Sequence, residues 1–127
     1  MPHIIVEYTE NLKAETDIRS LLKKINNVFI GRPHTFPVGG VRSRAIELHD
    51  YIVADDTEDD AFVHVTVKMG GGRSEDDKKD TCEALFTVVS DHFNDVFEKR
   101  YLALSLELFE FSEAGTYKKN NIHKRYK

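Results

Sequence analysis

The sequence predicts an α+β fold: a two-layer sandwich in which two helices cover one face of a four-stranded sheet. Along the chain, segments whose apolar residues alternate, as is typical of strands, are followed by segments whose apolar residues recur at helical spacing. The second half of the 127-residue chain repeats this plan, which gives the element order β-α-β-β-α-β. Helices on one face leave the other face of the sheet open, so we expect another subunit to cover that face.

The first half of the chain begins with the apolar run His3–Tyr8, which predicts a strand. Apolar residues at helical spacing predict a helix over about 13–30, which the following Gly and Pro residues end. Val38–Ala45 predicts a short strand, and Tyr51–Ala54 predicts another that completes a hairpin. The acidic run 55–60 lacks the spacing of a calcium loop and predicts a solvated loop.

The second half starts with Ala61–Met69, whose strict alternation predicts a strand with one apolar and one mixed face. Ser74 and Asp77 form an N-terminal capping pattern, and the apolar stripe behind them predicts a helix that ends near Glu98. Leu102–Phe109 alternates again and predicts the last strand. We expect residues 1–127 to form a single domain.

The composition excludes several classes of function. A net charge of −4 argues against a general nucleic-acid-binding protein, which would be basic. The single cysteine, Cys82, falls on an apolar helical stripe and predicts a core residue. The six histidines show no pair spacing of zinc enzymes, so we expect neither a metal nor a cofactor. No long apolar segment is present, and we therefore expect no membrane span and a cytoplasmic location.

Pro2 is the candidate catalytic residue. It follows Met1 and leads directly into the first predicted strand. Removal of Met1 would leave a secondary amine on a rigid ring, and terminal amines have an ordinary pKa of about 7.7–8.0. Burial or neighbouring cations lower that value, so the amine of Pro2 can act as a neutral base near pH 7.

Three arginines are candidate anion-binding residues. Arg73 follows three glycines and precedes the Ser74 cap, so its guanidinium joins a helix N-terminus, which already favours anions. Arg42 and Arg44 are two residues apart on a predicted strand, and their side chains therefore leave the same face. One of the pair can clamp a carboxylate while the other closes an ion pair between subunits.

Six short motifs follow one another along the chain: Pro2-His3, Gly40–Arg44, Ala61–Thr66, Gly72–Ser74, Tyr101–Ser105 and Asn120–His123. Together they resemble the 5-carboxymethyl-2-hydroxymuconate isomerase family of the tautomerase superfamily. The resemblance implies a tautomerase-like fold, a homotrimer, and an N-terminal proline that moves a proton within an unsaturated 2-hydroxy carboxylic acid in aromatic-compound catabolism. It assigns substrate binding to Arg42 and Arg73, and leaves Arg44 a supporting, more structural role.

Two alternatives to this isomerase remain open. One is another reaction of the tautomerase superfamily, on a 2-oxo acid or a different unsaturated acid. The other is a trimeric binding protein without catalysis, which would follow if Met1 is retained, because an acylated Pro2 nitrogen is an amide and cannot act as a base.

Overall fold

The computed structural model describes residues 1–126, whose four strands form one mixed sheet in the order β2-β1-β3-β4. The strands are β1 (His3–Thr9), β2 (Arg42–Leu48), β3 (Ala61–Gly70) and β4 (Leu102–Phe111). β1 pairs in parallel with β2 and antiparallel with β3, and β3 pairs in parallel with β4. The two parallel pairs are the two β-α-β units predicted from the sequence.

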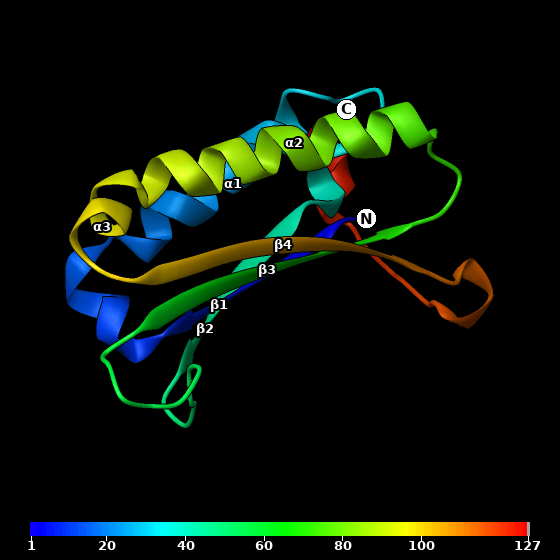
Figure 1. The fold of residues 1–127 in the computed structure, drawn as a ribbon. Coiled ribbons are helices and arrows are strands. Elements are labelled where there is room, and N and C mark those ends of the chain that lie inside the picture. The colour runs from blue at the N-terminus through cyan, green and yellow to red at the C-terminus, as the bar shows by residue number, and fades with distance from the viewer. Residues whose placement is uncertain (127) are drawn as a thin grey trace.

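The helices α1 (Ile18–Ile30) and α2 (Glu75–His92) lie on the same face of the sheet, and the short α3 (Asn94–Lys99) follows α2 (Figure 1). No helix within residues 1–126 is long and apolar enough to cross a membrane.

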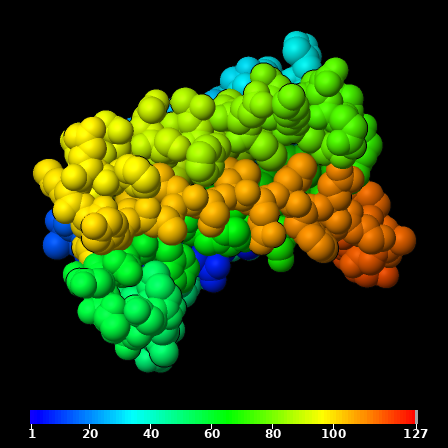
Figure 2. All heavy atoms as spheres, viewed as in Figure 1, coloured from blue at the N-terminus to red at the C-terminus, as the bar shows by residue number. Residues whose placement is uncertain are grey.

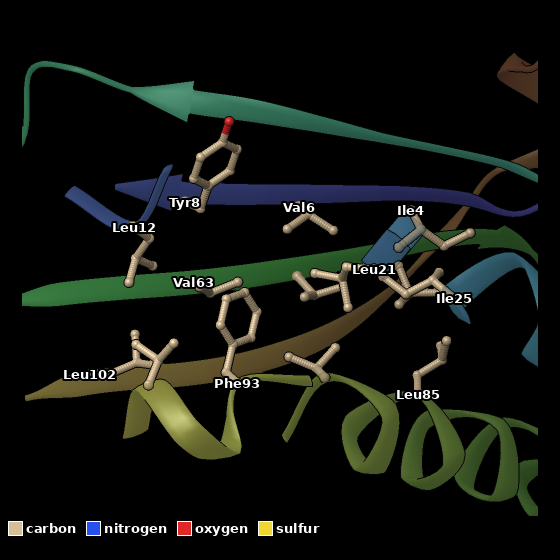
Figure 3. Close-up of a cluster of buried hydrophobic side chains, with 14 of the residues drawn as sticks. Ile4, Val6, Tyr8, Leu12, Leu21, Ile25, Val63, Leu85, Phe93 and Leu102 are labelled. Atoms are coloured by element: carbon tan, nitrogen blue, oxygen red, sulfur yellow. The ribbon is translucent and has the colours of Figure 1, made fainter. Parts of the chain in front are cut away.

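The core lies between the helices and this face of the sheet (Figure 3). It takes alternate residues of the strands, as the period-two pattern predicted. Side chains of both halves pack into one cluster. Its fully buried members include Ile4, Val6, Leu21, Ile25, Phe29, Val63, Val65, Val67, Leu85, Val89 and Phe93.

Two helix boundaries differ from the prediction. α1 begins five residues later than expected because Asp17 caps it, accepting a hydrogen bond from the Ser20 amide at 3.1 Å. The residues before that cap, Glu10–Glu15, form a separate 3₁₀ turn. The second helical stripe is interrupted at Phe93, whose ψ of 10° lies outside the α-helical range and divides the segment into α2 and α3.

The predicted short strand at Tyr51–Ala54, and with it the hairpin, is wrong for the single chain. Residues 49–60 form an irregular loop that projects from the body of the molecule on the side away from the helices (Figures 1 and 2). Ala54 and Asp56 have φ angles of 52° and 62°, and such left-handed residues interrupt an extended chain. Tyr51 instead packs edge-on against Phe62 of β3.

Candidate active site

The sheet topology brings four segments to one end of the molecule. His3 is paired with Arg42 at the start of β2 and with Lys68 near the end of β3, and Gly70 is paired with Phe111 at the end of β4. The amino terminus, the start of β2, the turn after β3 and the segment after β4 therefore meet at this edge. Figure 1 shows the amino terminus and the red C-terminal segment close together there.

Pro2 is buried, and the backbone holds it in place. Its carbonyl accepts a hydrogen bond from the Arg42 amide at 3.2 Å, which extends the β1–β2 pairing to the first residue before the strand. The residue in front of Pro2, Met1, lines two neighbouring cavities. A proline amine at this position would thus be rigid and directed into a pocket.

The larger cavity, of about 860 Å³, lies between the turn after β3 and the C-terminal segment. Its lining includes Met1, Arg73, Glu113 and Lys118. The smaller cavity, of about 290 Å³, is lined by His3, Arg42 and again Met1 and Lys118. Met1 therefore stands between the cavity of Arg73 and the cavity of Arg42.

Gly40 makes room for Met1 at this position. A Cβ atom on Gly40 would lie 2.9 Å from the Met1 Cγ, closer than real side-chain contacts allow. The first residue of the chain is consequently packed tightly against the turn that precedes β2.

The Arg73 guanidinium is held by hydrogen bonds to two different segments of the chain. Its Nη1 donates to the Gly70 carbonyl at 3.0 Å, and its Nε and Nη2 donate to the Thr35 carbonyl at 3.3 and 3.2 Å. The guanidinium also lies 4.6 Å from the centre of the buried Phe36 ring. Ser74 caps α2 as predicted, with its Oγ accepting from the Asp77 amide at 3.0 Å. A fixed cation and a helix N-terminus therefore face the same cavity.

Arg42 and Arg44 leave the same face of β2, as their spacing predicted, but only Arg42 reaches a cavity beside the amino terminus. The Nη1 of Arg44 lies 3.2 Å from the His3 Nδ1, on the face of the sheet away from the helices. The structure thus brings Met1-Pro2, Arg73 and Arg42 together and places Arg44 outside this group.

The electrostatics at the amino terminus favour a neutral amine. Burial is the main cause that lowers the pKa of the Met1 amine, and the positive charge of Arg73 lowers it next, followed by Lys118. Arg42 acts in the same direction, and the carboxylate of Glu113 opposes them. An amine in this environment loses its proton at a lower pH than an ordinary terminal amine.

Glu113 and Lys118 are site residues that the sequence did not point to. Asn120, on the same C-terminal segment, donates to the Gly39 carbonyl at 2.8 Å. The signal that could have pointed to Glu113 and Lys118 is the parallel pairing of β4 with β3. It brings the residues after Phe111 back beside Gly70, where the cavity opens.

Other reactive side chains lie away from this edge. Burial raises the pKa of the Cys82 thiol, which disfavours the nucleophilic thiolate. His64 has polar partners of its own, since its ring nitrogens lie 2.6 Å from the Ser105 hydroxyl and 3.0 Å from a Glu107 oxygen. Among residues 1–126, no three His, Cys, Asp or Glu side chains converge into a possible metal site.

Known proteins resemble this chain along almost its whole length. The sequence model of the 5-carboxymethyl-2-hydroxymuconate isomerase family matches residues 2–126. The chain belongs to this family. The 5-carboxymethyl-2-hydroxymuconate Delta-isomerase of Escherichia coli is 38% identical over 127 residues, which cover 100% of both chains. These matches confirm the expected family and make the chain an intramolecular isomerase.

Solved structures confirm the tautomerase-like fold. The crystal structure of a 5-carboxymethyl-2-hydroxymuconate isomerase from Deinococcus radiodurans R1 has a TM-score of 0.96 and 55% sequence identity, and the match covers 99% of this chain and 94% of that chain. A more distant structure, described as a fused 4-OT wild-type symmetric trimer, has a TM-score of 0.66 at 18% identity. That match covers 92% of this chain and 93% of the other, and at this identity it shows the fold alone.

Proposed function

We propose that this isomerase acts without a cofactor on an unsaturated 2-hydroxy carboxylic acid, and that the substrate is 5-carboxymethyl-2-hydroxymuconate. The base is the amine of Pro2 after removal of Met1. The observation that carries this proposal is the position of the amino terminus between two cavities, one with Arg73 and one with Arg42. The substrate named for the E. coli relative supports the choice of acid.

Removal of Met1 completes the site in this proposal. Met1 lines both cavities, so its loss joins them into one space with the amine of Pro2 at the centre. The two arginines then face a single ligand from different sides. Each guanidinium can hold a carboxylate, and both help to keep the neighbouring amine neutral.

The reaction needs one proton carrier. The neutral amine of Pro2 takes the proton of the 2-hydroxyl group, and the O–H electron pair forms the C2=O bond. The conjugated double bonds shift by one position, so that C3=C4 replaces C2=C3 and C4=C5. The carbon C5 then takes the proton back from the prolinium. Arg73 and Arg42 stabilise the negative charge that spreads over the dienolate between the two transfers.

The pH dependence of kcat/KM tests the base. Burial and Arg73 lower the pKa at this terminus, and only the neutral amine accepts a proton. We therefore expect kcat/KM to rise with pH through one ionisation below the ordinary amine pKa of about 7.7–8.0, and to stay level above it. The measurement is a pH profile on protein whose intact mass is known.

A variant with one extra residue before Pro2 is the matched control, because it makes the nitrogen an amide and should abolish turnover while the fold persists. Full activity of a protein shown by mass to retain Met1 would exclude the proline mechanism. An inactive protein that retains Met1 would instead agree with the alternative of a trimeric binding protein without catalysis.

We further propose that the active form is a homotrimer, a symmetry that the description of the fused 4-OT structure gives for that protein. The cytoplasmic location expected from the sequence stays a prediction.

A further inference from the structure

Lys118 is a cation of the site with no strong partner inside the described chain, residues 1–126. It lines both cavities together with Met1, and its side chain is 49% exposed. Its ion-pair partner among these residues is Glu113, whose Oε2 lies 3.9 Å from the Lys118 Nζ. This separation is longer than a hydrogen bond, so the ammonium keeps its donors for a ligand.

The segment that carries Lys118 is docked by the Asn120 side chain and by His123, and not by the lysine. Asn120, two residues further, donates to the Gly39 carbonyl, and its own Oδ1 accepts from the Ile122 amide at 2.7 Å. His123 packs directly on Gly39, where an added Cβ would lie 2.8 Å from the His123 Nδ1 and 2.9 Å from its Cα. Gly39 thus permits an approach that a larger residue would prevent.

The charges of the site suit a ligand with more than two carboxylates. Arg73 serves the larger cavity and Arg42 the smaller one, and Lys118 borders both. Glu113 stands beside Lys118 and would repel an approaching anion unless the ammonium compensates it. A third carboxylate placed near Lys118 would gain a charge-assisted contact and relieve this repulsion.

We propose that Lys118 binds the third carboxylate of the substrate and makes the site selective for tricarboxylates over dicarboxylates, with the Gly39-docked segment 118–123 holding the lysine in position. This inference rests on the proposed function for the identity of the ligand. Binding itself can be measured without turnover.

Calorimetric titration of the full chain with propane-1,2,3-tricarboxylate and with glutarate tests the proposal. The change Lys118→Gln should weaken binding of the tricarboxylate by about tenfold, the lower end for a contact between charged groups because the lysine is half exposed. Binding of glutarate should change by less than about twofold. Lys124→Gln is the matched control, since Lys124 is an exposed lysine directly after segment 118–123 and lines neither cavity.

Equal losses for the two acids in Lys118→Gln, no loss for either acid, or no preference of the unchanged protein for the tricarboxylate would each overturn the proposal. Loss of turnover with preserved tricarboxylate selectivity in binding would instead count against the proline chemistry alone. The two failures are therefore distinguishable.

A second variant tests the position of the lysine without removing its charge. Gly39→Ala should displace His123 and with it the docked segment, and should reduce tricarboxylate selectivity in the same direction as Lys118→Gln. In the double variant, Gly39→Ala should reduce tricarboxylate selectivity little beyond the effect of Lys118→Gln, because both changes remove the same contact. Additive losses in the double variant would contradict the role of Gly39 in positioning the lysine.

Discussion

The guanidinium of Arg73 has five N–H donors, and three of them bond to carbonyl oxygens of the chain. These bonds tie the turn after β3 to the loop after α1, and Arg73 also lines the larger cavity. The sequence predicted a ligand-binding arginine at this position. The carbonyl contacts add a structural role that residue spacing alone could not indicate, because the Thr35 contact crosses between two loops far apart in the sequence.

We expect Arg73→Ala to lower both activity and stability. Loss of a charged donor to the developing dienolate should reduce kcat/KM by about 10²–10³. Loss of the carbonyl bonds should lower the free energy of unfolding by about 1–3 kcal/mol. Steady-state kinetics and urea unfolding measure the two effects.

Arg32→Ala is the control for the stability effect, since Arg32 donates to the Val28 carbonyl at 2.8 Å and lines neither cavity. It should lose stability with kcat/KM unchanged. An Arg73→Ala protein with full kcat/KM would remove Arg73 from the anion site.

At the scale of elements, the two long helices have caps of the same kind in different surroundings. Asp17 caps α1 away from the cavities, and Ser74 caps α2 at the cavity wall. Either residue changed to Ala should lower the free energy of unfolding by about 1 kcal/mol, because one amide of the first turn loses its acceptor. Only Ser74→Ala should also reduce kcat/KM, since the first turn of α2 borders the larger cavity. Denaturant unfolding and kinetics on both variants test this difference, and equal kinetic effects would contradict it.

Most elements could be predicted from the sequence because periodicity reports which face of a strand or helix is buried. The alternation in Ala61–Met69 and the stripe through Leu85 and Val89 led to correct elements for this reason. Helix starts depended on local capping, and Asp17 with Ser20 was the signal that set the later start of α1. The loop after β2 was mispredicted because Tyr51–Ala54 has an apolar composition but no neighbouring strand within its own chain.

The sequence predicted some residues of the candidate site and missed others. Pro2, Arg42 and Arg73 belong to ordered elements or their ends, so pattern and resemblance could identify them. Glu113 and Lys118 follow the last strand, and only the strand order and register show that this segment returns to the amino terminus. Residues brought together by topology alone lack a local signal.

For the whole molecule, the face of the sheet away from the helices is open in the single chain. It carries Arg44 and Glu107 along with the apolar Ile46, which is 45% exposed on the edge strand β2. The edge of β4 is also unpaired within residues 1–126, and the apolar Ile52 on the projecting loop is 72% exposed. Open strand edges and exposed apolar residues are features that subunit association covers.

We therefore expect sedimentation equilibrium to give a particle of 43.8 kDa, three chains of 14.6 kDa each.

The change Ile46→Asp should shift the mass toward 14.6 kDa, because it places an unpaired charge on the face that the subunits bury. Ile30→Asp is a closely matched control: Ile30 has a similar exposure of 42% but lies at the end of α1, on the helix side. It should leave the trimer intact. We also expect kcat/KM to fall together with the mass in Ile46→Asp, because the trimer is the proposed active form. A stable and fully active 14.6 kDa wild-type protein would contradict a role for the open face of the sheet in assembly and catalysis.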